Sequence, residues 1–394
     1  MDEVLNPYAP GAGTQPPELA GREGEQASFG ALLKRLAAGR PEQNLALWGL
    51  RGVGKTVLLN RFAIEAEDAG WGSGYMELRG RGPLRPVLAQ VATQAAHSLG
   101  RREGVRKRLR QSLSVISSFS VTAMPTGVTF KIEVDPTPGR GDSGQLDVDL
   151  QDVLVELGET AREAGCGVVF FFDEMQFAEK DDLQALLAAF HRIAQRQLPV
   201  ALVCAGLPQL PGRLAEASSY AERLFQYIEI DRLTPEAARS ALALPANREG
   251  VDYEQSALEF ILSRADRYPF FLQTYGRYAW LIAERSPITD RDARAADTIA
   301  REQLDSGFHR ARFNRATAAE RRYLAAIADL GDGPQHTAEV SGMLGVDQSG
   351  TALVRQNLID VKGLIYSPRR GYVDFTAPLF GDYIRRHHPL ESLR

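Results

Sequence analysis

The sequence is poor in cysteine and in lysine. Its 394 residues include two cysteines, Cys166 and Cys204, and six lysines against forty arginines. Two thiols exclude a disulfide framework and a four-ligand zinc site, so we expect both cysteines simply to fill strands. The scarcity of lysine makes a lysine that stands inside a short motif informative.

Long apolar runs and a surplus of positive charge are missing too. The longest apolar segments, such as residues 168–172, are far shorter than the ~20 residues of a membrane helix, and the first residues lack the pattern of a signal peptide. We therefore expect a cytoplasmic protein with no membrane partner. The net charge of −4 means that any contact with nucleic acid has to come from local patches.

The length predicts two or three domains. Residues 1–18 are rich in proline and are expected to form an extended arm. Over residues 19–232, apolar strands alternate with amphipathic helices, which predicts an α/β fold with a parallel sheet covered by helices. Residues 233–312 are expected to form a helical lid. Residues 313–394 give three helices and a short hairpin, as in a winged helix-turn-helix.

An insertion is expected in the α/β core at about residues 114–146. Phe119, Val121 and Ala123 alternate with polar residues, and a second alternating stretch follows the Met-Pro-Thr-Gly turn at 124–127. This period of two predicts a β-hairpin, preceded by a helix over about 86–112. A loop rich in proline and glycine is expected over 135–144.

Residues 49–56 read Gly-Leu-Arg-Gly-Val-Gly-Lys-Thr and match the phosphate-binding loop pattern. They lie after a predicted strand and before a predicted helix, which is the context that the pattern requires. The alternative is a plain glycine-rich turn. In a phosphate-binding loop, backbone amides surround the phosphates of ATP or ADP, Lys55 reaches the β- and γ-phosphates, and Thr56 binds Mg²⁺. The expected loop contacts are Gly49, Gly52, Val53 and Gly54.

A second motif joins this loop. The apolar strand at residues 168–172 is followed by Asp173 and Glu174. Ligands bind at the carboxyl edge of open parallel sheets, so both carboxylates are expected near the phosphates. Asp173 is the candidate Mg²⁺ ligand, and Glu174 is the candidate base that polarises the attacking water. An apolar strand that ends in Asp-Glu without any catalytic role is the alternative.

The two motifs together resemble those of the AAA+ ATPases. The Leu-Ala-Gly-Arg-Glu segment at 19–23 is similar to a box that initiator-type and STAND-type members place beside adenine. The resemblance is strongest to bacterial and archaeal ATPases that are similar to origin-recognition initiators and end in a winged helix. It implies ATP hydrolysis and assembly into oligomers.

Further roles follow from this resemblance. Gly21 and Arg22 would lie near the base, and Pro269 would press against adenine from the lid. Arg223 stands where such ATPases carry an arginine finger for a neighbouring subunit, although a surface salt bridge is an equal alternative. The usual polar sensor is missing, except for Gln209, and the lid turn lacks a clear sensor arginine, with only Arg264 and Arg267 close by. These departures favour slow hydrolysis.

Two regions are candidates for contact with double-stranded DNA. In the winged helix, the candidate base-reading residues come from residues 349–361 and the residue before them, and four arginines could touch phosphates. Its near-neutral charge leaves DNA and protein contact equally open. The basic run at residues 101–110 either contacts a nucleic-acid backbone or is a solvated helix end. The candidate residues are Gln348, Arg355, Gln356, Asn357, Arg369, Arg370, Arg385 and Arg386.

The sequence therefore favours an ATP-binding AAA+ switch. Its nucleotide state would control assembly into a homo-oligomer or the engagement of DNA. The alternative is a STAND-like signalling ATPase whose winged helix is an autoinhibitory clamp or binds an unknown protein partner, without direct contact to DNA.

Overall fold

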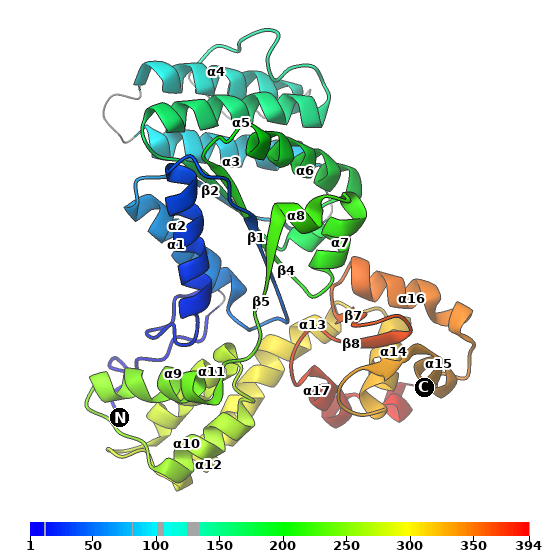
Figure 1. The fold of residues 1–394 in the computed structure, drawn as a ribbon. Helices are drawn as coiled ribbons and strands as arrows, with labels where there is room; N and C mark the ends of the chain where they lie inside the picture. The colour runs from blue at the N-terminus through cyan, green and yellow to red at the C-terminus, as the bar shows by residue number, and fades with distance from the viewer. Residues whose placement is uncertain (12, 81, 101–105, 124–133, 394) are drawn as a thin grey trace.

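The computed structural model describes residues 1–11, 13–80, 82–100, 106–123 and 134–393. Figure 1 shows three bodies, with the α/β core above, a helical bundle below it and the C-terminal winged helix at the side. Among the described residues, no helix is both long and apolar enough to cross a membrane.

A five-stranded parallel sheet forms the centre of the core, with the order β2-β3-β4-β1-β5. Strands β3 and β4 are wholly buried. Both cysteines are buried and free; Cys204 lies in β4 as predicted, whereas Cys166 precedes β3 and lies outside the strand. The strands are β1 (Asn44–Trp48), β2 (Gly72–Glu77), β3 (Val168–Asp173), β4 (Val200–Gly206) and β5 (Phe225–Glu229).

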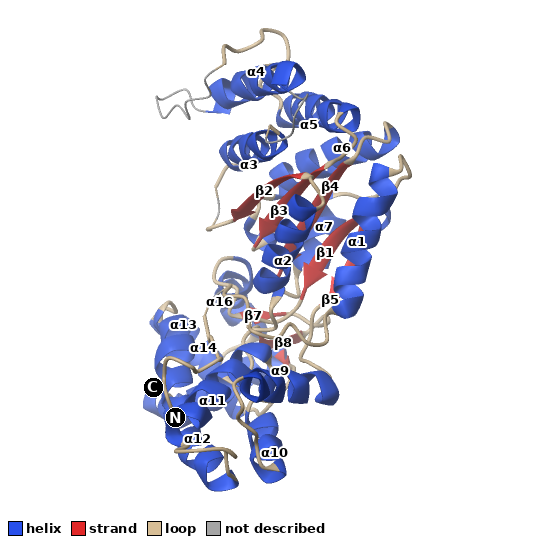
Figure 2. Ribbon diagram, turned by 90° about the vertical axis from the view of Figure 1, so that its left-hand side faces the viewer, coloured by secondary structure: helices blue, strands red, loops and turns tan. Residues whose placement is uncertain are grey.

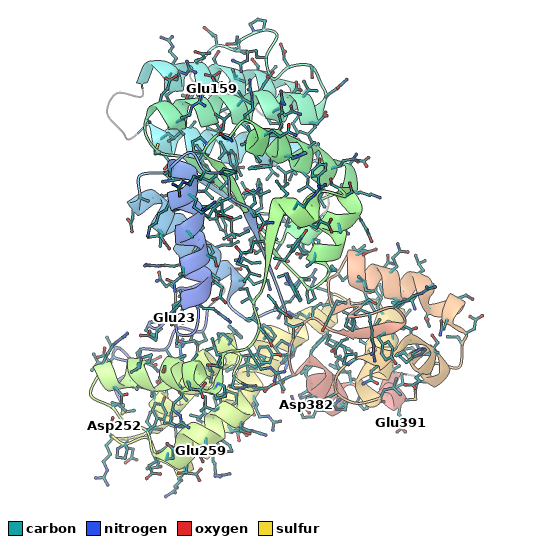
Figure 3. All side chains as sticks on the ribbon, in the orientation of Figure 1. Glu23, Glu159, Asp252, Glu259, Asp382 and Glu391 are labelled. Atoms are coloured by element: carbon teal, nitrogen blue, oxygen red, sulfur yellow. The ribbon has the colours of Figure 1, made fainter. Side chains whose placement is uncertain are left out.

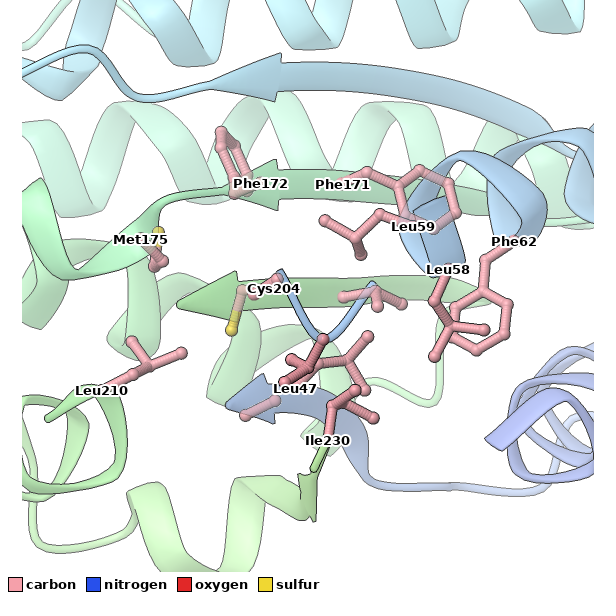
Figure 4. Close-up of a cluster of buried hydrophobic side chains, with 14 of the residues drawn as sticks. Leu47, Leu58, Leu59, Phe62, Phe171, Phe172, Met175, Cys204, Leu210 and Ile230 are labelled. Atoms are coloured by element: carbon pink, nitrogen blue, oxygen red, sulfur yellow. The ribbon is translucent and has the colours of Figure 1, made fainter. Parts of the chain in front are cut away.

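Helices cover both faces of this sheet (Figure 2). Neighbouring residues of β3 point to opposite faces: Phe171 meets Phe29, which stacks on Phe62, whereas Phe170 meets Phe190. Figure 4 shows the first of these layers, where the sheet packs against the helix that follows β1. The core helices are α1 (Glu23–Ala37), α2 (Lys55–Asp68), α3 (Leu84–Leu99), α4 (Arg106–Ala123), α5 (Leu146–Glu163), α6 (Lys180–Gln195), α7 (Leu210–Ala217) and α8 (Ala221–Leu224).

The prediction of a β-hairpin is wrong for its first strand. Residues 114–123 belong to α4, which packs on α3 and α5 as an outer layer. Helical spacing accounts for this outcome, because Ile116 and Phe119 are buried whereas Val121 is exposed. Ser120 donates to the Ile116 carbonyl at 2.7 Å, which satisfies its hydroxyl within the helix. Residues 124–133, which would hold the turn and most of the second strand, lie outside the described part of the chain.

The expected helix over 86–112 is likewise wrong, because α3 ends at Leu99 and α4 begins at Arg106. Residues 101–105 of the basic run lie outside the described residues, as do the side chains of Arg106 and Lys107. Arg108 is not a free cation. It pairs with Glu159 at 2.9 Å and with Glu163 at 3.4 Å on α5. Figure 3 labels Glu159 in this outer layer.

The C-terminal part of the chain is helical until a small sheet. The fold class that the sequence predicted, a parallel sheet followed by a helical lid and a winged helix, is confirmed. The helices are α9 (Pro235–Arg248), α10 (Gln255–Arg264), α11 (Pro269–Ile282), α12 (Asp290–Gln303), α13 (Arg310–Asn314), α14 (Ala318–Asp329), α15 (Thr337–Met343), α16 (Gln348–Asp360) and α17 (Phe380–His387). A π-helical turn, η2 (Leu304–His309), joins α12 to α13.

The small sheet of the winged helix has the order β6-β8-β7 and is antiparallel. Its strands are β6 (Gln335–His336), β7 (Ile365–Tyr366) and β8 (Tyr372–Phe375). A 3₁₀ turn at Leu390–Leu393 follows α17, and another, at Met175–Phe177, follows β3 in the core. Arg369 and Arg370 lie exposed at the hairpin tip. Arg385 and Arg386 are engaged within the chain, with Asp332 and Asp305 respectively at 2.7 and 2.6 Å.

Candidate functional site

The phosphate-binding loop lies between β1 and α2, at the carboxyl edge of the sheet. Only glycine fits at position 49, because a Cβ there would stand 2.0 Å from the Ile230 carbonyl oxygen. Gly54 precedes α2 with a φ of 96°, a conformation that side chains disfavour. The loop therefore has the curled backbone that the sequence predicted, with its amides at the start of a helix.

Lys55 is folded back onto its own loop. Its ammonium donates to the carbonyl oxygens of Gly49 at 2.9 Å and Leu50 at 2.7 Å. Burial lowers the pKa of Lys55 to about 8, against the opposing attraction of Glu174 and Asp173. An anion beside Lys55 would replace these two carbonyls with a stronger, charge-assisted partner.

Thr56 and Asp173 meet as predicted. The Thr56 hydroxyl donates to Asp173 Oδ2 at 2.5 Å, and the Tyr75 hydroxyl donates to the same oxygen at 3.4 Å. Burial raises the pKa of Asp173, while its hydrogen bond with Thr56 opposes that rise. A hydroxyl and one carboxylate suit Mg²⁺ that keeps water and phosphate oxygens as its other ligands. The two residues present therefore fit a phosphate-bound Mg²⁺.

Both carboxylate oxygens of Glu174 have donors. Arg51 Nη1 donates to Oε1 at 3.1 Å, and the Gln176 amide donates to Oε2. The Glu174 backbone is left-handed, with φ 53° and ψ 36°, which is uncommon for a residue with a side chain. Such backbone strain is typical of functional sites. Glu174 thus lies beside the loop, as predicted, but its oxygens are occupied.

A cavity of about 760 Å³ opens over the loop. The described residues that line it come from the N-terminal arm, the phosphate-binding loop and the start of α2, the ends of β2 and β3, α11, and the segment from the end of α12 to α13. The lining residues that matter for the chemistry are Gly52, Gly54, Lys55, Thr56, Asp173, Glu174, Pro269, Phe270 and Arg312. Its size suits a nucleotide.

The N-terminal arm forms one wall of the cavity. Tyr8 anchors it to the lid, because its hydroxyl lies 2.5 Å from the Leu242 carbonyl oxygen and 2.7 Å from the Tyr253 hydroxyl. Further along, the Gly13 carbonyl accepts from the Asn60 side chain at 3.2 Å. The arm therefore spans from the lid to α2 across the cavity mouth, and Figure 1 shows it in dark blue beside α9 and α11.

Gly21 and Arg22 lie behind the loop rather than at this wall. The Arg22 guanidinium donates to the carbonyl oxygens of Val53 at 3.0 Å and Asp231 at 2.6 Å. Gly21 has a φ of 69°, and a Cβ there would stand 2.6 Å from that of Ala237. Neither residue is among those that line the cavity in the described chain. Arg22 thus braces the loop from behind and Gly21 packs against the lid, while the contact of this pair with adenine stays a prediction.

The lid turn does reach the cavity. Pro269 starts α11 and lines the cavity, and the Phe270 amide donates to the Gly52 carbonyl at 3.3 Å. The two arginines nearest to this turn, Arg264 and Arg267, are not among the described residues that line the cavity. Arg264 forms a two-pronged pair with Asp297, at 3.0 and 2.7 Å.

Arg312 was missed by the sequence analysis. It comes from α13, at the end of the lid, and its guanidinium carbon lies 3.7 Å from the centre of the Phe308 ring. Phe308 stacks in turn on Phe270, with ring centres 5.1 Å apart. Burial, and secondarily Arg51, lowers the pKa of Arg312 to about 10. No local motif marks this residue, because its place depends on the path of the whole lid.

Comparison with known proteins agrees with this geometry. Residues 18–203 match the family model described as AAA ATPase domain. The chain contains an AAA ATPase domain. Residues 306–384 match a second model, described as a domain of unknown function (DUF8462). Comparison with curated proteins gives no match.

Solved structures are similar to this chain over most of its length. The Walker-type ATPase PABY2304 of Pyrococcus abyssi is similar with a TM-score of 0.59 and 16% identity, over 94% of this chain and 97% of that one. Cdc6p from Pyrobaculum aerophilum has a TM-score of 0.47 and 16% identity, over 100% and 99%. The RuvB Holliday junction branch migration motor of Thermotoga maritima has a TM-score of 0.46 and 17% identity, over 94% and 95%.

Arg223 lies far from the cavity of its own AAA domain. It is exposed on α8, just before Phe225, which pairs with the first residue of β1, whereas the phosphate-binding loop follows the last residue of that strand. The length of β1, ~3.3 Å per residue, separates the two. Arg223 is therefore too far away to act on the cavity of its own chain, and its role as a finger for a neighbouring subunit stays a prediction.

The winged helix touches the AAA domain directly. The Arg51 amide in the phosphate-binding loop donates to the Thr376 carbonyl at 2.8 Å. Gln209, the candidate polar sensor, donates to the Ile359 carbonyl at 3.5 Å and so faces α16 instead of the cavity. Figure 1 shows α16 just below α7, in agreement with this contact. The end of the expected reading helix is thus turned towards the AAA domain.

Proposed function

We propose that the chain is a slow Mg²⁺-dependent ATPase whose bound nucleotide controls the docking of its winged helix. Its working parts are the arm at 1–18, the nucleotide-binding core at 19–232, the lid at 233–312 and the winged helix at 313–394. The observation that carries the proposal is the hydrogen bond between the Arg51 amide and the Thr376 carbonyl. Through this bond, the winged helix contacts the loop that would hold the phosphates.

Each residue of the site has a role in this proposal. The loop amides at Gly49, Gly52, Val53 and Gly54 and the Lys55 ammonium bind the phosphates of ATP or ADP. Thr56 and Asp173 hold Mg²⁺, which neutralises charge on the β- and γ-phosphates when it is bound. Glu174 accepts a proton from the attacking water. Pro269 and the arm close the opposite side of the cavity.

Arg312 adds a contact to the terminal phosphate. It lines the same cavity as Lys55, and its nearest charged neighbours include the cation of Arg51. An anion would relieve this like-charge crowding in a partly buried place. Because Arg312 lies on the segment that leads into the winged helix, its contact with ATP would link the nucleotide to that domain.

Slow hydrolysis is supported by the state of the catalytic groups. Glu174 has donors on both oxygens, and Gln209 is turned away from the cavity. Fast hydrolysis needs a free base and a preorganised set of donors around the phosphates. The geometry therefore suits a switch better than a motor.

The output of the switch is a homo-oligomer, a contact with double-stranded DNA, or both. Arg223 is exposed and available to a neighbouring subunit, and Arg369 and Arg370 are exposed at the hairpin tip. Gln348 and Gln356 are also exposed on α16. In this proposal, ATP releases the winged helix from the AAA domain and so frees the end of α16 that faces Gln209.

A protein-binding winged helix without contact to DNA is the second candidate. It is favoured by the internal pairing of Arg385 with Asp332 and of Arg386 with Asp305, which removes two of the expected phosphate contacts. It is also favoured by Leu353, which is 70% exposed on α16. In this second form, the docked winged helix is an autoinhibitory clamp.

Mass photometry tests the proposal and separates the two candidates. The full chain is measured with ADP, with ATP and with a slowly hydrolysed ATP analogue, each with and without duplex DNA. Assembly that requires ATP and grows with DNA supports the first candidate, and Arg223→Ala should abolish it. A monomer under every condition would exclude the oligomer and favour the clamp.

A further inference from the structure

Glu174 accepts hydrogen bonds from two donors. Both donors are connected to one segment of the winged helix, residues 363–376, which we call the corner. The first donor is the Arg51 guanidinium, which lies 3.1 Å from Glu174 Oε1 and is 16% exposed. The second is the Gln176 amide, whose side chain is buried. A carboxylate that accepts a hydrogen bond on each oxygen is held in one orientation and keeps only about two of its four lone-pair sites for the attacking water.

Arg51 contacts both Glu174 and the winged helix. Its side chain pairs with Glu174, while its main-chain amide donates to the Thr376 carbonyl at 2.8 Å. Thr376 lies in a rigid corner, because its hydroxyl donates to the Gly363 carbonyl at 2.7 Å and its amide donates to the Leu364 carbonyl at 3.0 Å. A movement of this corner therefore moves the backbone of Arg51.

Gln176 is connected to the same corner through Leu207. Its carbonyl oxygen accepts from the Leu207 amide at 3.0 Å. Leu207 packs against Gly363 so tightly that a Cβ at position 363 would stand 2.8 Å from Leu207 Cδ1 and 3.3 Å from Arg51 Nη2. Both donors of Glu174 thus depend on how the corner at residues 363–376 sits on the AAA domain.

We infer that Arg51 is a positioning residue that holds Glu174 inactive while the winged helix is docked. The inference rests on the proposed function and adds to it the control of the base. When the corner leaves, Arg51 loses its anchor and releases Glu174. The water oxygen then attacks the γ-phosphorus, the bond from that phosphorus to the bridging oxygen breaks, and Glu174 takes the proton of the water.

The test uses the full chain and two independent variants. Arg51→Met removes the charge and keeps most of the side-chain length. Gly363→Ala introduces a methyl group that pushes against Leu207 and Arg51 without changing any residue of the nucleotide site. Gly345→Ala is the matched control, because Gly345 has a similar left-handed φ of 71°, belongs to the same domain and has open space around its Cβ position.

Both test variants should raise the kcat of ATP hydrolysis about tenfold, a small part of the ~10²–10⁴ that a general base contributes. The Kd for ATP should change less than about twofold, since the loop amides remain. The double variant should be no faster than either single one, because both remove the same restraint. Adding Glu174→Gln should abolish the gain, and Gly345→Ala should produce none.

Hydrogen exchange gives a second readout that does not depend on turnover. In Gly363→Ala, the Arg51 amide should exchange faster, because its bond to Thr376 is weakened. A chain that binds no ATP would overturn the proposed function. A chain that binds ATP normally, but whose kcat stays unchanged or falls in Arg51→Met and Gly363→Ala, would overturn this inference alone. If Arg51→Met fails to bind ADP, its kcat carries no information about Glu174, and the kcat of Gly363→Ala alone tests the inference.

Discussion

The guanidinium carbon of Arg312 lies over the ring of Phe308, 3.7 Å from its centre, and this ring in turn stacks on Phe270 of the lid. The stack places the Arg312 cation, which lies just before the winged helix in the sequence, in the wall of the nucleotide cavity. Arg312→Ala should therefore weaken the binding of ATP about tenfold or more, the value of one charge-assisted hydrogen bond. ADP, which lacks the third phosphate, should bind almost as before.

Titration with fluorescent ATP and ADP analogues measures this difference. Arg315→Ala is the control, because Arg315 is exposed just after α13 and does not line the cavity in the described chain. An equal loss of both nucleotides in Arg312→Ala would show that Arg312 supports the cavity without distinguishing the two ligands.

The N-terminal arm should control how fast the nucleotide leaves. Tyr8→Ala removes the ring that packs on Gly276 and the hydroxyl that contacts Leu242 and Tyr253, so the arm should detach from the lid. We expect faster dissociation of a fluorescent ADP analogue in a stopped-flow chase, since a wall of the cavity opens. Glu3→Ala, which removes only an exposed ion pair with Arg277 at 3.7 Å, should leave the rate unchanged.

Acid should destabilise the junction of the lid and the winged helix through His309. This side chain is buried between Phe380 and Tyr383, and burial lowers its pKa to about 3, although Asp305 opposes the shift and Arg312 and Arg386 add to it. The unfolded chain, with a pKa near 6.5, binds a proton that the folded chain rejects. The stability that His309 contributes is therefore complete above about pH 6.5 and is lost as the pH falls towards 3.

His309→Phe should remove this sensitivity. Between pH 7 and pH 5 the wild type should lose about 2 kcal/mol more stability than the variant, measured as the change of the thermal unfolding midpoint with pH. His97→Gln, an exposed substitution on α3, should behave as the wild type does. Equal acid sensitivity in His309→Phe and the wild type would mean that His309 is charged or mobile in the folded protein.

Arg108 should stabilise the outer layer of the core instead of binding DNA. It bridges α4 to Glu159 and Glu163 of α5, beside the buried Glu156. Arg108→Ala should lower the thermal midpoint by ~2–4 °C, as expected for the loss of about 1 kcal/mol in a partly buried network. DNA affinity and its dependence on salt should not change. Arg110→Ala is the control, and a larger loss of DNA affinity in Arg108→Ala than in this control would show that Arg108 contacts nucleic acid.

The nucleotide motifs were predictable because their signal is local. The loop at residues 49–56 and the pair Asp173 and Glu174 need only a strand, a turn and a helix in the right order, and parallel strands bring their carboxyl ends to one edge. The structure brings residues 51, 52 and 54–56 of the loop, both carboxylates and Pro269 together around one cavity. The alternation of strands and helices also gave the correct fold class.

The remaining parts of the site depend on long-range packing that no single segment encodes. Arg312 reaches the cavity only because the lid turns the chain back, and the arm forms a wall only because Tyr8 finds a place on α11. The hairpin prediction failed because Ile116 and Phe119, three residues apart, are buried while Val121 is exposed, so the apolar residues of α4 follow a helical spacing and not a period of two. The pairing of Arg51 with the winged helix likewise has no signature in the sequence.

The central claim is that the nucleotide controls the docking of the winged helix on the AAA domain. Spin labels at Glu216→Cys on α7 and Gln356→Cys on α16 report this docking, since both positions are exposed and the native cysteines are buried. Pulsed electron-spin distances should show one short distance with ADP and a longer or broader one with a slowly hydrolysed ATP analogue. The same short distance with both nucleotides, at concentrations where both are bound, would contradict the claim.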